Sequence, residues 1–468
     1  MKSRKHLLYT ALSTFTALTV TASMIPMALA ASGSKTASTA AAVTATVPTS
    51  VDETYVMSEE NNQVKITESG VYKITGSCSD GNIVVKKGTT GVTLILEDLT
   101  LASTTGATLS CNKSSEVTVY VVGSVTLTDN ETDESSDDYD GAAIKAKAGS
   151  TLTITGTGTL NIHGNAKNGI KGSDADEDES LAAAVITVEG ATIDIDAKND
   201  GINAGGDLIL AGGTITVSAG DDGIHSDAGL YLNGANVVVT DSYEGLEGAT
   251  IELNAGTGYI TASDDGVNAA ADGTASSLAI NGGYWWINAG GDGLDAGGDS
   301  NNDNGTITMN GGTVEVYGAA NNGNAALDAG RGITYNGGTL LAVGMSGMAE
   351  APSGGSVLVF GSAGMGGGMM GQGGPMGGMQ NGPQGGMNGG RISLTTTSVQ
   401  NAAFSGMQNG PQGGFGGQQF QQSTGSVSIG AGSTIEIKDA SGNTIYSATA
   451  VKSANSVVFA SDDIASGS

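Results

Sequence analysis

A six-residue motif recurs through the middle of the chain and limits the folds that the chain can adopt. Each copy contains a polar residue, a glycine, a branched aliphatic residue, a variable residue and a small residue, as in Asp221-Asp222-Gly223-Ile224-His225-Ser226. The central glycines of the six copies are Gly169, Gly201, Gly223, Gly245, Gly266 and Gly293. Their spacing gives a period of about 22 residues, which is typical of proteins built by stacking one structural unit.

Each period contains three short β-patterns separated by glycines. In one period these patterns are Gly201–Ala204, Leu208–Leu210 and Thr214–Val217. Three strands with tight corners in about 22 residues predict one coil of a parallel β-helix, whose coils hydrogen-bond to one another at about 4.8 Å. We therefore expect an all-β solenoid with three faces. The 77 glycines and 6 phenylalanines among 468 residues fit a fold that has many turns and a core of small aliphatic side chains.

Residues one period apart should form columns. In the third strand of each coil, alternation predicts that Ile215, Val217, Trp285 and Ile287 point inward. Two residues after the central glycine, another column should face outward and run from basic to acidic. Its members are Lys145, Lys171, Asn203, His225, Glu247, Asn268, Asp295 and Asp328. We interpret His225 as a surface member of this column, because no Ser or Cys nucleophile accompanies it.

Acidic side chains precede the central glycines. Carboxylates about 5 Å apart repel each other by roughly 3 kcal/mol at an effective dielectric near 20, and a bound cation removes this repulsion. Oxygen ligands without paired cysteine or histidine favour Ca²⁺. The alternative is that these residues only make the turns. The predicted calcium ligands are Asp200, Asp221, Asp222, Glu244, Asp264, Asp265, Asp292, Asn203 and Asn268.

Three aromatic residues should form a platform for sugar rings. Alternation places Tyr284 and Trp286 on the outside, and Tyr259 takes the place of Trp286 one coil earlier. Exposed aromatic rings on a flat β-face can stack on the C–H faces of sugars. In the alternative interpretation, loops such as 270–277 cover them. Trp285 is expected in the core.

The ends of the chain differ in composition from the repeats. Residues 1–30 have a basic start, an apolar stretch and an Ala28-Leu29-Ala30 cleavage site, which indicates a signal peptide. We expect a secreted or cell-surface protein without membrane insertion after cleavage. The remaining predicted segments are a flexible leader at 31–50, the β-helix at 51–348, a disordered Gly/Met/Gln-rich insertion at 349–425 and a C-terminal β cap at 426–468.

The charge balance limits the partners. The formal net charge of -29 excludes nucleic acid as a ligand, because the phosphate backbone would be repelled. Cations are the expected counter-partners. Export and the even number of cysteines favour a disulfide between Cys78 and Cys111.

The repeats, the Gly-Gly-Thr-Ile/Val strands and the closing segment 451–459 together resemble one family. It is the bacterial secreted carbohydrate-binding β-helix family, whose fold is similar to family 9 polysaccharide lyases and pectate lyases. The resemblance covers about 51–348 and 426–463. It implies a right-handed parallel β-helix with Ca²⁺ that binds plant cell-wall polysaccharide, namely cellulose or acidic, polygalacturonate-like pectic chains. The family's calcium aspartates would correspond to positions such as Asp200, Asp222 and Asp265.

Non-catalytic binding is the favoured interpretation, with no catalytic residues, and two others stay open. A Ca²⁺-dependent pectate-type lyase working by β-elimination would need a lysine or arginine as base, and Lys171 and Lys198 lie near Asp200. An adhesin or structural spacer would need neither a base nor a sugar platform.

Overall fold

The computed structural model describes residues 46–136, 139–271, 274–297, 304–361, 393–397, 421–423, 427–439 and 441–464, the short segments 393–397 and 421–423 as backbone only. The predicted signal peptide, most of the predicted leader and most of the predicted insertion lie outside these residues. No helix in the described part of the chain is long and apolar enough to cross a membrane. The described elements are all β-strands.

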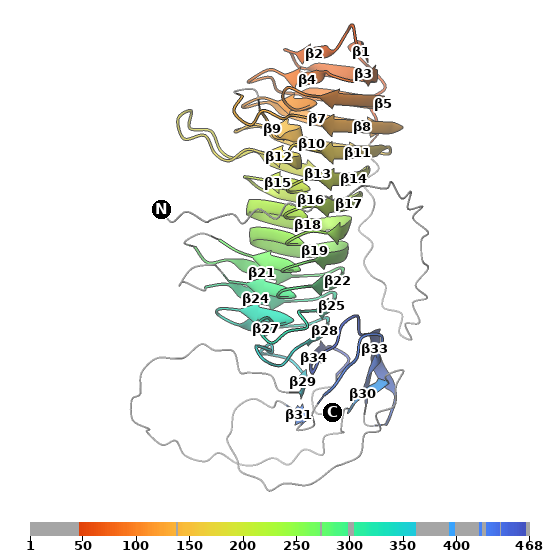
Figure 1. Cartoon of the computed structure of the whole chain (residues 1–468), viewed down its shortest axis with the longest axis vertical. Helices are drawn as coiled ribbons and strands as arrows, with labels where there is room; N and C mark the ends of the chain where they lie inside the picture. Colours follow the sequence, from red (N-terminus) through yellow and green to blue (C-terminus); the bar gives the residue numbers. More distant parts are fainter. Residues whose placement is uncertain are drawn as a thin grey trace. The chain divides into compact units, whose positions relative to one another are not determined.

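Most strands lie in three parallel rows, in which each strand pairs with the strand of the next repeat (Figure 1). The first row is β2 (Gln63–Ile66), β4 (Asn82–Val85), β6 (Leu109–Cys111), β9 (Ala142–Ala146), β12 (Asn168–Gly172), β15 (Ile202–Ala204), β18 (Ile224–Asp241), β19 (Leu246–Ala262), β20 (Val267–Ala269), β23 (Leu294–Ala296) and β26 (Leu327–Ala329). The second row is β1 (Glu53–Met57), β3 (Gly70–Cys78), β5 (Val92–Ser103), β7 (Glu116–Val122), β10 (Thr151–Gly156), β13 (Val185–Val188), β16 (Leu208–Leu210), β18, β19, β21 (Ser277–Ile280), β24 (Thr306–Met309) and β27 (Ile333–Tyr335). The third row is β5, β8 (Ser124–Asp129), β11 (Thr159–Gly164), β14 (Thr192–Ala197), β17 (Thr214–Ala219), β18, β19, β22 (Tyr284–Ala289), β25 (Thr313–Tyr317) and β28 (Thr339–Gly344).

The rows are joined, which corrects the predicted fold class. β5 and β18 turn through corners without leaving the sheet, so β5 pairs with strands of two rows and β18 with strands of all three. As a result β5, β7, β10, β13, β16, β18, β17, β14, β11 and β8 pair in turn and return to β5. The strands thus form a closed ten-strand parallel β-barrel with further strands outside it. The predicted right-handed parallel β-helix with three faces is wrong, because we expected every corner to interrupt the strands.

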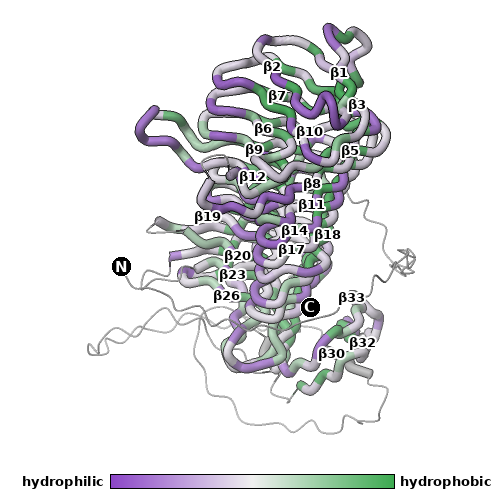
Figure 2. The backbone as a smooth tube through the Cα atoms, turned by 45° about the horizontal axis from the view of Figure 1, so that its top comes forward, coloured by the Kyte–Doolittle hydropathy of each residue, from purple (hydrophilic) through white to green (hydrophobic). Residues whose placement is uncertain are grey.

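The columns are confirmed by the strand register. Asn203 pairs with His225, and His225 pairs with Glu247. The inward positions of the third row are also confirmed, since Trp285 and Ile287 are fully buried. In Figure 2 hydrophobic residues recur along the strands, and hydrophilic residues gather at the loops between them.

The last strands run antiparallel. β34 (Ser456–Ser461) pairs in the antiparallel sense with β28 and with β29 (Val357–Gly361), whereas β29 pairs in parallel with β31 (Gln421–Ser423). A separate antiparallel sheet contains β30 (Ser393–Thr397), β32 (Thr434–Lys438) and β33 (Thr444–Thr449). β34 thereby covers the edge of β28, which an unpaired parallel row would leave open. β29, β30 and β31 lie within the range predicted as a disordered insertion.

The two cysteines are free and buried, so the expected disulfide is wrong. Cys78 ends β3 in one row and Cys111 ends β6 in another. Their strand partners are Leu101 and Val85, so the two thiols lie in different rows of strands. Burial raises the pKa of the Cys111 thiol to about 12.

The repeat glycines allow neighbouring repeats to approach closely. A Cβ atom on Gly201 would lie 2.3 Å from Val217 Cγ1 and 2.6 Å from the carbonyl oxygen of Gly223. Val217 is fully buried, and the Gly223 carbonyl belongs to the backbone of the next repeat. Neither atom can move away without disturbing the stack.

We expect Gly201→Ala to lower the free energy of unfolding by about 1–3 kcal/mol, as overpacking of a core does. Thermal melting followed by circular dichroism measures the effect. Gly430→Ala is the control, because its Cβ would meet nothing nearer than Ser433 Oγ at 3.4 Å. A Gly201→Ala protein that melts with the wild type would contradict this account of the motif.

Candidate functional site

The corner between the third and first rows carries three adjacent columns of polar side chains, which we call the polar edge. Backbone hydrogen bonds keep the columns in register, for example from Tyr243 N to Asp221 O and from Asp264 N to Tyr243 O. The outer column is Asn199, Asp221, Tyr243 and Asp264. The acidic column is Asn168, Asp200, Asp222, Glu244, Asp265 and Asp292. The mixed column is Lys145, Lys171, Asn203, His225, Glu247, Asn268, Asp295 and Asp328.

The motif explains why these side chains gather there. The glycine permits close backbone contact with the next repeat, and the aliphatic residue after it, such as Ile224, is fully buried. The residue before the glycine and the residue two after it therefore lie on the same side, three positions apart. In this way one repeat brings Asp222 within 3.0 Å of His225.

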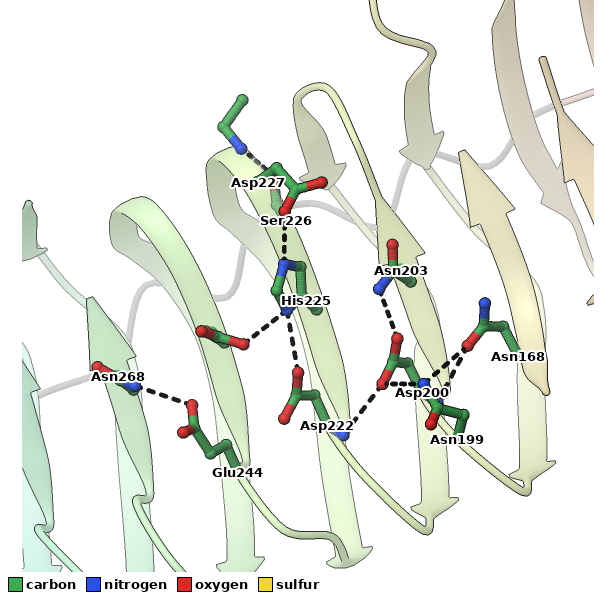
Figure 3. Close-up of polar contacts among 12 residues, drawn as sticks. Asn168, Asn199, Asp200, Asn203, Asp222, His225, Ser226, Asp227, Glu244 and Asn268 are labelled. Carbon is green, nitrogen blue, oxygen red and sulfur yellow. Dashed lines mark hydrogen bonds and ion pairs between the residues drawn. The ribbon is translucent and has the colours of Figure 1, made fainter. Parts of the chain in front are cut away.

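Amide groups satisfy the first carboxylate of the acidic column. Asp200 is buried and accepts hydrogen bonds from Asn199 Nδ2 at 3.0 Å, from Asn203 Nδ2 and from Asp222 N at 3.3 Å (Figure 3). Burial raises the pKa of Asp200, and the hydrogen bond from Asn203 opposes this change. Asp200 and Asn203, both predicted calcium ligands, are thus hydrogen-bonded to each other.

His225 lies among three carboxylates. Its Nδ1 atom is 3.0 Å from Asp222 Oδ2 and 2.6 Å from Glu247 Oε2, and its Nε2 atom is 3.0 Å from Asp227 Oδ1. Burial lowers the pKa of His225, but the hydrogen bonds to Asp222, Asp227 and Glu247 raise it to about 12. The imidazolium therefore balances the charge of Asp222. Sequence reasoning placed His225 in the column but not in this cluster.

In the second half of the polar edge, from Glu244 to Asp292, the polar side chains are less completely balanced by hydrogen bonds and opposite charges. Burial and then Glu247 raise the pKa of Glu244 to about 8, and burial raises that of Asp292 to about 7. Asn268 Nδ2 donates to Glu244 Oε2 at 2.9 Å, while Asn268 Oδ1 is buried without a hydrogen-bond partner. Asp265 Oδ1 accepts from Asp292 N at 2.6 Å. Oxygen atoms thus dominate a region in which two carboxyl groups resist ionisation.

The lysines of the lyase hypothesis lie at the other end of the polar edge. Lys171 donates to Asn203 Oδ1, and Lys198 is exposed. Lys145 is the lysine that sequence reasoning did not single out as a base. Burial and the neighbouring Lys171 lower its pKa to about 8.

The predicted aromatic platform is only partly exposed. Tyr259 is 46% exposed and its ring centroid lies 5.8 Å from that of the half-buried Tyr284. Trp286, however, packs against a second hydrophobic cluster from the C-terminal strands, and its ring is 6.1 Å from that of the buried Tyr317. The expectation of a solvent-facing Trp286 is wrong, because this cluster, whose members run from Tyr317 to Ile464, leaves the side chain only partly exposed. Trp285 is fully buried, as predicted, and donates from Nε1 to Gly282 O at 2.7 Å.

Two polar features were missed from the sequence. Tyr243 in the outer column is 49% exposed, and its hydrogen bond to Asp264 raises its pKa to about 12. At another corner, each asparagine amide donates to the preceding asparagine of a ladder. The ladder is Asn233, Asn254, Asn281, Asn310 and Asn336. Repeated Asn-Gly pairs were the signal that could have revealed it.

Comparison with known proteins adds the following findings. A family model described as "Carbohydrate-binding domain-containing protein" matches residues 60–269. Among solved structures, the chain is similar to a polysaccharide lyase-like protein from C. thermocellum, described as a gadolinium derivative. The identity is 24%, the TM-score is 0.33, and the match covers 55% of this chain and 85% of that chain. No curated protein matches this chain.

The raised pKa of Glu244 predicts how stability depends on pH. The folded state keeps the proton up to about pH 8, whereas the unfolded state loses it near 4.5, the ordinary pKa of a glutamate. Stability from this group is therefore fully present below pH 4.5 and is lost as pH rises to about 8. In chelator, the melting temperature should fall over this range, and it should fall less in Glu244→Gln.

Asp196→Asn is the control, because Asp196 is an exposed carboxylate of another row. Melting curves at constant ionic strength between pH 5 and pH 9 make the comparison. Equal slopes in Glu244→Gln and the wild type would show that Glu244 ionises freely in the folded protein.

Proposed function

We propose that this protein is a non-catalytic carbohydrate-binding protein that holds plant cell-wall polysaccharide on the polar edge. The observation that carries the proposal is the carbohydrate-binding family model over residues 60–269. That segment contains the whole outer column and the exposed rings of Tyr243 and Tyr259. We further propose that the protein acts outside the cell, as the N-terminal sequence suggests.

The chemistry of the polar edge suits sugars. Carboxylates and amides can bond sugar hydroxyls, and an exposed aromatic ring can stack on the apolar face of a sugar ring. Tyr243 supplies such a ring between Asp221 and Asp264 of the same column. Within the predicted platform, the exposed Tyr259 and the half-buried Tyr284 beside it are a second surface for the same ligand.

Calcium is part of the proposal, with its place narrowed to the second half of the polar edge. Asn268 Oδ1 is a buried oxygen without a partner, and Glu244 and Asp292 lie in the same region. Hard oxygen ligands of this kind suit Ca²⁺. Asp200, Asn203 and Asp222 already have partners within the polar edge, so they support calcium binding less. Asp221, Asp264 and Asp265 complete the predicted ligand set.

Calcium would also decide which polysaccharide binds. An acidic pectic chain is repelled by a protein with a net charge of -29 unless a cation lies between them. Cellulose is neutral and needs no such bridge. Retention on polygalacturonate should therefore depend on Ca²⁺, whereas retention on cellulose should not.

We expect the protein to be retained on at least one of these polymers when each is presented as an insoluble matrix. Tyr243→Ala should weaken retention by about fivefold to tenfold, since one stacked ring contributes on the order of 1 kcal/mol. Tyr259→Ala serves as the matched exposed tyrosine and tests the second surface. Depletion assays with and without chelator measure both effects.

Three outcomes would contradict the proposal in different ways. Unchanged retention in both tyrosine variants would remove both surfaces. Retention on neither polymer would favour a structural spacer. Release of unsaturated product from polygalacturonate, measured by ultraviolet absorbance, would favour a lyase, and Lys145, Lys171 and Lys198 would then be tested as bases.

Calcium should also stabilise the fold. A ligand that binds only the folded state at 100 times its dissociation constant contributes about 2.7 kcal/mol. The melting temperature should rise with millimolar Ca²⁺ and return on chelation, and Asn268→Ala should reduce the rise. Asn233→Ala, in the separate asparagine ladder, is the control. Identical melting with and without Ca²⁺ at matched ionic strength would rule out a structural calcium site.

A further inference from the structure

His225 has the surroundings of a metal-ligating histidine. Its Nδ1 atom faces two carboxylate oxygens at once, Asp222 Oδ2 at 3.0 Å and Glu247 Oε2 at 2.6 Å. The ligand atoms of these three residues all lie within 4.8 Å of one another. Asp222 is buried, and His225 and Glu247 are half-buried. Three converging ligand atoms from two neighbouring repeats are therefore present in one partly enclosed place, and Figure 3 shows Asp222 and His225 pointing toward each other there.

The other nitrogen of His225 has the partner that metal-bound histidines have. Nε2 lies 3.0 Å from Asp227 Oδ1, which can only accept a hydrogen bond when ionised. In metal sites, a carboxylate at this position fixes the tautomer and the orientation of the ring. With Nε2–H donating to Asp227, Nδ1 is the nitrogen that is left for a metal ion.

We propose that Asp222, His225 and Glu247 form a zinc site, with Asp227 as a positioning residue. Zn²⁺ would take the place of the Nδ1 proton, which passes to solvent, and would bind Nδ1, Asp222 Oδ2 and Glu247 Oε2. A water molecule or a sugar hydroxyl would complete four-coordination. This site is separate from the oxygen-only region around Asn268 and does not depend on carbohydrate binding.

The ligand set selects the metal. Imidazole with two carboxylates suits Zn²⁺ and other late first-row ions, whereas Ca²⁺ prefers oxygen ligands alone. Zinc–nitrogen and zinc–oxygen bonds of about 2.0–2.2 Å separate neighbouring ligand atoms by about 3.3 Å in a tetrahedral site. The observed separations of 2.6 and 3.0 Å need only small side-chain movements to reach that value.

The sequence column explains why this site occurs once in the described repeats. The strand partners of His225 are Asn203 and Glu247. Only on the Glu247 side does a carboxylate from the next repeat face Nδ1. Asn203 instead donates to Asp200, so the preceding repeat offers no equivalent nitrogen.

Cobalt titration of the full chain tests the proposal. The protein is first freed of metal with chelator and then held in excess Ca²⁺, which fills oxygen-only sites. Co²⁺ should give the visible absorption bands of a four-coordinate ion with one equivalent bound, and Zn²⁺ should displace it. His225→Gln should weaken Co²⁺ binding by more than about 100-fold, and Asp227→Asn by about 10- to 100-fold.

His163→Gln is the matched control, because His163 lies on β11 in another row and pairs with Thr128 and Asp196. It should leave the cobalt bands and the affinity unchanged. If His225→Gln does not fold, the cobalt affinity of Asp227→Asn and the cobalt spectrum of the wild type decide whether the site exists. Wild-type protein without four-coordinate bands, Co²⁺ displaced by Ca²⁺, or full affinity in Asp227→Asn would each overturn the site. None of these results depends on whether polysaccharide binds.

Discussion

Parallel pairing of each repeat with the next, at a place where only glycine fits, is the constraint on which the other features depend. At Gly201, the side chain of Val217 and the backbone of Gly223 fill the space that a Cβ would need. This contact fixes the register, and the register fixes the columns. A single type of backbone contact therefore orders both the aliphatic core and the polar edge, and it does so in a chain with 6 phenylalanines and 2 tryptophans.

Columns have an electrostatic consequence that isolated side chains do not have. Any acidic residue of the motif meets another acidic residue one strand spacing away, so its charge must be balanced locally. Three solutions are visible along one column. Side-chain amides donate hydrogen bonds to the carboxylate of Asp200. The imidazolium of His225 balances the negative charge of Asp222. The pKa of Glu244 rises to about 8, so that its carboxyl group can hold a proton. The variable residue of the motif decides which solution a repeat uses.

The sequence predicted those features that depend on period and alternation. The pairing of His225 with Glu247 and the burial of Trp285 both follow from counting along the repeat. Other features depend on contacts that no local pattern contains. Closure of the barrel follows from β5 and β18 turning corners with their pairing intact. The cover over Trp286 comes from C-terminal strands, where Tyr446 and Trp286 share Glu315 as a hydrogen-bond partner. Hydrogen bonding around His225 depends on side-chain rotamers, which spacing does not specify.

One position of the motif therefore separates two kinds of cation chemistry within a few strand spacings. Where that position is histidine, nitrogen enters the ligand set and a late first-row metal becomes the better match. Where that position is Asn268, the side chains offer only oxygen atoms as metal ligands. The Oδ1 atom of Asn268 is then a buried oxygen without a hydrogen-bond partner beside Glu244. The backbone is the same in both repeats, since Glu247 pairs with His225 on one side and with Asn268 on the other. Glu247 is thus the residue through which the two regions are coupled: its carboxylate bonds His225 and at the same time raises the pKa of Glu244. A charge added on the His225 side of Glu247 must therefore alter the ionisation of Glu244 on the other side.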